Sequence, residues 1–101
     1  MIVDERTYLL KTGQLNRYRD LYRQIGYPIQ RRHLGEPLGV FTVEFGELDG
    51  WVHLWQYQDL ADRVRRRAAL GQDGGWREFQ RQTGDLIVHR RNRLLERVTL
   101  G

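Results

Sequence analysis

The feature that most constrains the fold is a strand, a tight turn and a second strand near the middle of the chain. Residues 38–46 have the sequence LGVFTVEFG, and residues 51–58 have the sequence WVHLWQYQ. Both segments are rich in the aromatic and β-branched residues that are typical of strands. The intervening ELDG contains Asp-Gly, which favours a tight hairpin turn. These segments therefore predict an antiparallel β-hairpin.

Both faces of this hairpin carry apolar bulk. Side chains alternate between the two faces of a strand, so one face of residues 51–58 carries a stripe made of Trp51, His53, Trp55 and Tyr57. The opposite face carries Val52 and Leu54. A monomer rarely leaves an aromatic stripe of this size in water. We therefore predict a homodimer in which two sheets pack face to face around an enclosed space.

The rest of the chain predicts two further strands and four short helices. Leu15 begins a helical spacing of apolar residues that should end at Gly26, since a proline follows, and Asp59 is a good N-cap. The predicted strands are 2–10, 38–46, 51–58 and 85–100, and the predicted helices are 15–25, 28–34, 60–70 and 76–83. The order is β-α-β-β-α-β with each helix broken in two. It predicts a single ferredoxin-like domain over residues 1–101, with an α+β fold and helices on one face of an antiparallel sheet.

The predicted helix 60–70 contains acidic residues four positions before arginines. Asp59 precedes Arg63 and Asp62 precedes Arg66, a spacing that favours ion pairs on a helix surface. Leu60, Val64 and Ala68 are expected to form the buried side of this helix. These residues predict a solvated helix laced with ion pairs rather than a basic binding patch.

Composition excludes several classes of function. The chain of 101 residues has no cysteine, so it has neither disulfides nor thiolate metal sites. Its three histidines stand at no metal-ligand spacing, and we predict no metal and no cofactor. A net charge of +4 spread along the chain does not favour nucleic acid as a partner. No apolar run is long enough to span a membrane, and early charges oppose a signal peptide, so we expect a cytoplasmic location.

Nearly the whole chain resembles a known family. The resemblance is carried by three segments, ERTYLLKTG, PIQRRHLG and VHLWQYQDLADRVRRRAAL. The chain resembles a bacterial stand-alone member of the NIPSNAP family. The resemblance implies the dimeric α+β barrel superfamily, in agreement with the hairpin argument. That superfamily includes cofactor-free monooxygenases, but a shared fold does not transfer their chemistry. NIPSNAP proteins are poorly defined biochemically, and the eukaryotic relatives are associated with mitochondria and membrane traffic.

The candidate ligand-binding residues are expected on two neighbouring strands. They are Arg6 and Tyr8 in the first strand, and His53, Trp55 and Tyr57 in the third. If both sets face the dimer interior, Arg6 would fix a carboxylate or an enolate, His53 would move a proton near neutral pH, and Trp55 would stack on a planar ligand. In the alternative, Arg6 pairs with Asp4 or Glu44 and His53 forms a hydrogen bond within the interface.

Arg31, Arg32 and His33 occupy the last turn of the predicted helix 28–34. Cations at this position are favourable to the helix dipole, which accounts for the residue types without any ligand. The same three residues are the candidates for an anion-binding rim at the mouth of the barrel.

Taken as a whole, the sequence predicts a homodimeric protein of undefined biochemical role. It would bind a small acidic or planar molecule in the barrel interior, or act as an interaction protein. The alternative is a cofactor-independent monooxygenase or isomerase that uses the same pocket. No catalytic residue is assigned.

Overall fold

Four strands form one antiparallel sheet in the computed structural model, which describes all 101 residues. In chain order the elements are β1 (Ile2–Leu10), α1 (Leu15–Leu21), a π-helical segment η1 (Tyr22–Gly26), α2 (Tyr27–Leu34), β2 (Gly39–Thr42), β3 (Gly50–Tyr57), α3 (Leu60–Gly71), α4 (Gly74–Thr83), a 3-10 turn η2 (Gly84–Leu86) and β4 (Ile87–Glu96).

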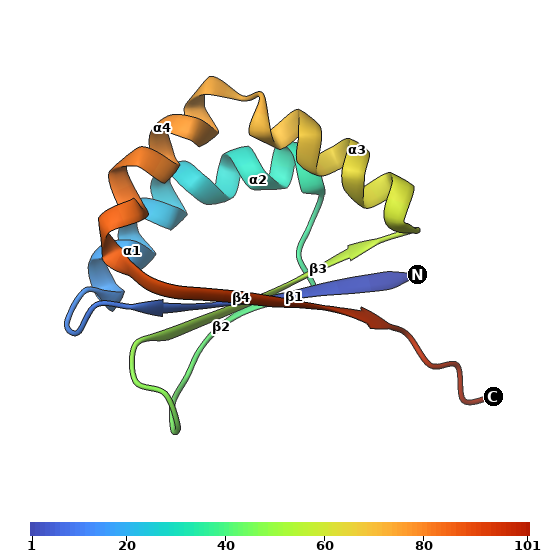
Figure 1. The fold of residues 1–101 in the computed structure, drawn as a ribbon, viewed down its shortest axis with the longest axis horizontal. Helices are drawn as coiled ribbons and strands as arrows, with labels where there is room; N and C mark the ends of the chain where they lie inside the picture. The colour runs from blue at the N-terminus through green and yellow to red at the C-terminus, as the bar shows by residue number, and fades with distance from the viewer.

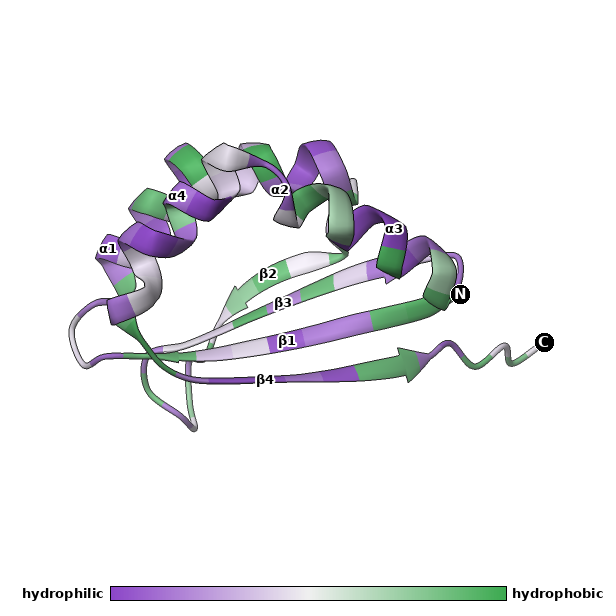
Figure 2. Cartoon of the chain, turned by 45° about the horizontal axis from the view of Figure 1, so that its top comes forward, coloured by the Kyte–Doolittle hydropathy of each residue, from purple (hydrophilic) through white to green (hydrophobic).

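The sheet has the strand order β2-β3-β1-β4, and Figure 2 shows the four strands side by side. All of the helices arch over one face of the sheet, while the other face is left uncovered (Figure 1). This arrangement confirms the predicted ferredoxin-like α+β fold. None of the helices combines the length and the apolar character that crossing a membrane would require.

The aromatic stripe of β3 faces the helices of its own chain, so the predicted role of this stripe in a dimer is wrong. Trp51, Trp55 and Tyr57 are buried at 4, 0 and 1% exposure. They pack in the core with Tyr18 and Tyr22 from the first helical segment. The uncovered face carries the opposite, aliphatic side of β3. The helices of the same chain cover this aromatic stripe, whereas the prediction had a partner's sheet cover it.

Two predicted strands are shorter in the structure. β2 ends at Thr42 instead of residue 46. The N–H of Val43 still donates to the carbonyl of Gly50 at 3.1 Å, and left-handed backbone at Gly46 (φ 114°) and Asp49 (φ 62°) turns the loop beyond it. β4 spans Ile87–Glu96 instead of 85–100. Its last residue pairs with Ile2, where β1 begins, so the ladder has no further partner strand.

The helix predicted to stop at Gly26 continues without a break to Leu34. Gly26 has helical backbone angles (φ −68°, ψ −47°), and the N–H of Tyr27 donates to the carbonyl of Tyr22 five residues earlier. This π-type spacing accommodates Pro28, which has no N–H and would clash with the carbonyl of a regular α-turn. The predicted end at Gly35 is confirmed, with φ 81°.

Gly26 serves close packing rather than helix termination. A Cβ atom at this position would lie 2.7 Å from Cζ of Phe79, whose ring is buried. Gly26→Ala should therefore lower the free energy of unfolding by about 1–3 kcal/mol through overpacking. Gly71→Ala is the matched control, because a Cβ there meets nothing within 4 Å, and it should be neutral or stabilising. Urea unfolding of both variants measures this difference, and equal effects would contradict the packing argument.

α3 buries its charged side, contrary to prediction. Leu60 and Val64 are 58 and 64% exposed, whereas Asp62 is buried. Of the two predicted ion pairs, Asp62–Arg66 is present at 2.9 Å. Asp59–Arg63 is absent, because Asp59 caps the helix by accepting from the N–H of Asp62 while Arg63 reaches the sheet. The inward side of α3 thus combines the paired Asp62 with the buried Leu70.

Candidate functional site

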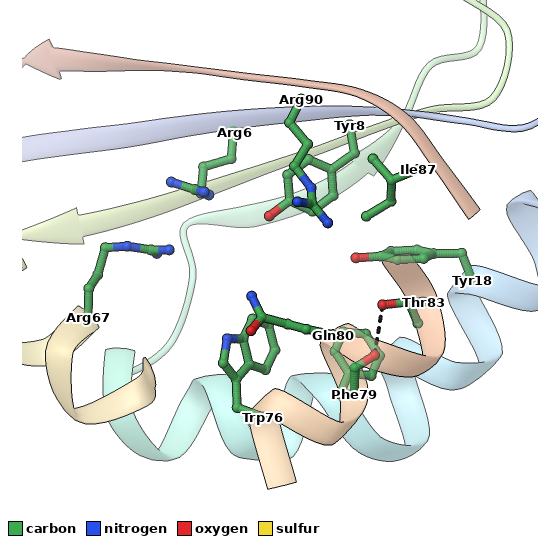
Figure 3. A pocket seen from close by; sticks show the side chains of 10 residues that line it. All are labelled: Arg6, Tyr8, Tyr18, Arg67, Trp76, Phe79, Gln80, Thr83, Ile87 and Arg90. Atoms are coloured by element: carbon green, nitrogen blue, oxygen red, sulfur yellow. Dashed lines mark hydrogen bonds between the residues drawn. The ribbon is translucent and has the colours of Figure 1, made fainter. Parts of the chain in front are cut away.

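A small cavity of about 60 Å³ lies between the sheet and the helices α3 and α4. Figure 3 shows side chains from the strands converging on it from one side and side chains of the helices from the other. It is lined by Arg6, Tyr8, Tyr18, Arg67, Trp76, Phe79, Gln80, Thr83, Ile87 and Arg90. Three of these residues are arginines and none is acidic.

The three arginines differ in how their charges are compensated. Arg6 pairs with Asp4 at 3.3 Å. The guanidinium carbon of Arg90 lies 5.6 Å from the centre of the Tyr8 ring, a cation–π contact. Nη1 of Arg67 is enclosed by protein and forms no hydrogen bond of ordinary geometry, although the Tyr57 hydroxyl, which is also buried and unpaired, is its neighbour. A buried donor without a partner costs about 1–3 kcal/mol, and more when it is charged, so an anion at this position would stabilise the site.

Asp4 holds the arginines around it in place. Its carboxylate has no exposed surface and accepts hydrogen bonds from Arg6 at 3.3 Å, Arg63 at 3.2 Å and Asn92 at 3.4 Å. Burial disfavours the charged form of Arg6, but the nearby Tyr8 and Asp4 outweigh this effect and raise its pKa. Arg6 is therefore a permanent cation in the cavity wall.

His53 lies behind Tyr8 rather than in the cavity lining. Its ring contacts that of Tyr8 edge-on, with 5.1 Å between centroids, and its Nδ1 accepts a hydrogen bond of 2.7 Å from Nε1 of Trp55. Burial, and then repulsion from Arg6, lower the pKa of His53 to about 3. The imidazole is therefore neutral near pH 7 with its proton on Nε2, so the predicted proton transfer near neutral pH finds no support.

The buried neutral His53 makes stability depend on pH. Its pKa falls from the ordinary 6.5 to about 3 in the folded chain, so between these values the unfolded chain binds the extra proton. Stability is then complete above about pH 6.5 and falls as the pH is lowered, by up to about 1.4 kcal/mol per pH unit. Urea unfolding of the wild type and of His53→Gln between pH 6.5 and 4.5 measures this slope, and parallel profiles would contradict it.

The cavity lining offers no group that would act as a base at neutral pH. It contains neither a carboxylate nor an imidazole. Burial raises the pKa of the Tyr18 phenol well above its usual value of 10, so this side chain stays protonated. The arrangement is suited to holding an anion rather than to removing a proton from a substrate.

Of the five candidate ligand-binding residues, the two on β1 line the cavity and the three on β3 do not. Arg6 and Tyr8 line the cavity. His53, Trp55 and Tyr57 lie on the same side of the sheet, in register with β1, but contribute nothing to the lining. All five face the chain's own helices, so their expected place in the interior of a dimer is wrong. The helices cover the side of the sheet that the prediction gave to a partner.

Arg31, Arg32 and His33 lie away from this cavity and pair with acids. Arg31 bonds Glu36, while Arg32 lies 3.9 Å and His33 2.8 Å from Asp73. Asp73 in turn caps α4 by accepting from the backbone N–H groups of residues 75 and 76. These contacts favour the role at the helix end over the anion-binding rim.

The sequence reasoning missed Arg67 and Arg90. Arg90 pairs in register with Tyr8, so the alternation of β4 could have placed it on the cavity side once β4 was set beside β1. Arg67 had no such signal, because the apolar spacing of α3 pointed its other side inward. No group of three or more metal-ligating side chains gathers anywhere in the chain.

Comparison with known proteins gives consistent matches. The family model described as NIPSNAP matches residues 3–100. Protein NipSnap homolog 2 of Danio rerio is 36% identical over 95 residues, which make up 93% of this chain and 32% of the relative. The NipSnap homolog of Dictyostelium discoideum is 37% identical over 77% of this chain and 34% of its own length. The chain thus spans about a third of the length of these curated relatives.

Solved structures agree with these relatives. A NIPSNAP family protein of unknown function from Agrobacterium tumefaciens superposes with a TM-score of 0.95, is 36% identical, and covers 100% of this chain and 91% of its own. A putative antibiotic biosynthesis monooxygenase from Nitrosomonas europaea has a TM-score of 0.73 over 98% of this chain and 100% of its own. Because its identity is 13%, it shares the fold alone.

Proposed function

This chain belongs to the NIPSNAP family, as its motifs predicted, and we propose that it binds a small anionic molecule in the cavity between the sheet and helices α3 and α4. The observation that carries the proposal is Arg67. Its enclosed Nη1 lacks a partner in a wall that holds three arginines and no acid. A bound anion would supply the missing acceptor and reduce the repulsion among the guanidinium groups.

Binding is favoured over the enzymatic alternative. An isomerase that moves a proton needs a positioned base. The lining contains neither a carboxylate nor an imidazole to serve as that base. The likeness to the monooxygenase is one of fold and transfers no activity. The cofactor-independent monooxygenase or isomerase thus stays a prediction from the sequence alone.

We further propose that the chain forms a homodimer through the uncovered face of the sheet. The helices cover one face only (Figure 1). The other face presents Phe41, Val52 and Leu54, since Phe41 pairs with Val52 and both alternate with residues that face the helices. A patch of aliphatic and aromatic side chains on one face of a sheet favours a second sheet as its cover. This patch replaces the aromatic stripe as support for the dimer.

Native mass spectrometry of protein purified under mild conditions from its own host tests both proposals together. We expect a species of twice the 12.1 kDa chain mass that retains a small acidic adduct. A dimer that takes up no anion under any condition would contradict the binding proposal, and a monomer would contradict the dimer.

An interaction role and a cytoplasmic location stay predictions from the sequence. The exposed Leu60 and Val64 on the outer side of α3 are the place where a protein contact outside the sheet would be sought.

A further inference from the structure

The cavity has a cationic side and an apolar side. In Figure 3, Arg6 and Arg67 lie at one side, and Tyr18, Phe79 and Ile87 lie at the other. Arg90 lies over the Tyr8 ring between the two sides. A ligand that fills this space would therefore present its charge at one end only.

The cationic side is the place for a carboxylate. Arg67 contributes an enclosed donor without a partner, and Arg6 shares its single acid, Asp4, with Arg63. Guanidinium groups present paired N–H donors in the planar geometry that a carboxylate accepts. A carboxylate between Arg6 and Arg67 would satisfy the open donor without disturbing Asp4.

The apolar side disfavours a second charge. The side chains there are aromatic or aliphatic, and of the two hydroxyls that of Thr83 is already committed, because its Oγ1 donates to the carbonyl of Phe79 at 2.9 Å. The phenol of Tyr18 is buried. A second anionic group at this end would lose its hydration and would have only Arg90, already held over the Tyr8 ring, as a compensating cation.

The size of the cavity limits the ligand further. Its volume of about 60 Å³ is several times the roughly 10–15 Å³ that one water requires, and well below the roughly 150 Å³ of an apolar cavity that admits benzene. The enclosed part of the ligand is thus smaller than an aromatic ring. A carboxylate with two or three carbons attached fits this description.

We infer that the cavity selects a short-chain monocarboxylate, with its carboxylate between Arg6 and Arg67 and its carbon chain against Tyr18, Phe79 and Ile87. This inference rests on the proposed anion binding and adds the class of the ligand. It separates monocarboxylates from two other small anions: phosphate has no apolar end, and a dicarboxylate carries a second charge into the apolar side.

The test uses butyrate, succinate and inorganic phosphate as probes for the full chain. Binding is followed by two-dimensional NMR of the tryptophan indole N–H groups. Trp76 lines the cavity, whereas Trp51 and Trp55 do not. Trp55, whose ring contacts that of His53 rather than that of a lining residue, serves as the internal reference. We expect butyrate to shift the Trp76 signal and to bind at least tenfold more tightly than succinate or phosphate.

Two variants locate the carboxylate. Arg67→Gln should weaken butyrate binding at least tenfold, and Arg67→Lys, which keeps the charge and loses the paired donors, should weaken it less. Arg65→Gln is the matched control, because Arg65 lies on the same helix with its side chain 72% exposed and paired to Asp62. It should leave binding unchanged. Ile87→Phe, which fills the apolar side, should weaken butyrate and leave any phosphate binding unaltered.

The outcomes separate this inference from the proposal beneath it. If phosphate or succinate binds as tightly as butyrate and Arg67→Gln weakens each equally, the proposal of anion binding stands. The inference that the cavity selects a monocarboxylate is then wrong. If no probe shifts Trp76 at millimolar concentration, both fail. Because the comparison of probes uses the wild-type chain, it decides the question even where a variant does not fold.

Discussion

Replacing Asp4 by alanine is expected to lower the free energy of unfolding by about 3–5 kcal/mol, because breaking a buried ion pair leaves the other charges uncompensated. Asp4 is fully buried and accepts hydrogen bonds from Arg6, Arg63 and Asn92. The two arginines are only 16 and 21% exposed, so water compensates them poorly. Urea unfolding at pH 7 measures the loss.

A surface ion pair on the same strand provides the control. Glu5 is one residue away and pairs with Arg93 at 2.8 Å, where the arginine is 68% exposed. Glu5→Gln should change stability by about 1 kcal/mol or less. If the two substitutions had similar effects, Asp4 would not be holding the arginines in place, and the account of the cavity wall would lose its support.

Replacing Trp55 by alanine should also cost about 3–5 kcal/mol, the range for deletion of a large buried aromatic side chain. Trp55 has no exposed surface. Its Nε1 donates to Nδ1 of His53 at 2.7 Å, so the substitution opens a cavity and also leaves a buried acceptor without a partner.

Trp55→Phe separates these two contributions. It keeps an aromatic ring and removes the indole N–H, so it should destabilise by less than the alanine variant and still by about 1–3 kcal/mol. Chemical denaturation of both variants gives the two values. A phenylalanine variant as stable as the wild type would show that the hydrogen bond to His53 contributes nothing.

Much of the fold could be predicted because local signals and the overall arrangement agree. The N-cap Asp59 and the glycine at the end of α2 each mark the boundary that the structure shows. The Asp-Gly pair marks only the start of β3, because the loop before it is longer than the predicted tight turn. The order of strands and helices then permits few arrangements of the sheet. The family followed from motifs spread along nearly the whole chain, and the comparisons confirm it.

The site was less predictable because periodicity shows which residues share a face and not what that face contacts. The stripe of β3 that contains Trp55 was correctly grouped but given to the wrong neighbour. α3 is a stronger case, because its apolar residues Leu60 and Val64 point outward. The inward side instead carries the buried Asp62, bonded to Arg66, together with Leu70. No local rule predicts that outcome, so Arg67 was missed.

The π-helical segment at residues 22–26 sets how many residues must lie between α1 and α2. An α-helix turns about 100° with each residue, so a deletion that restored the regular spacing would rotate α2 by about that angle against α1. Gln30 would swing away from the Tyr22 hydroxyl that donates to it, and Leu34, 1% exposed, would leave the core. A substitution such as Gly26→Ala acts at its own position, whereas a change of length by a single residue would shift the inward side chains of α2 together.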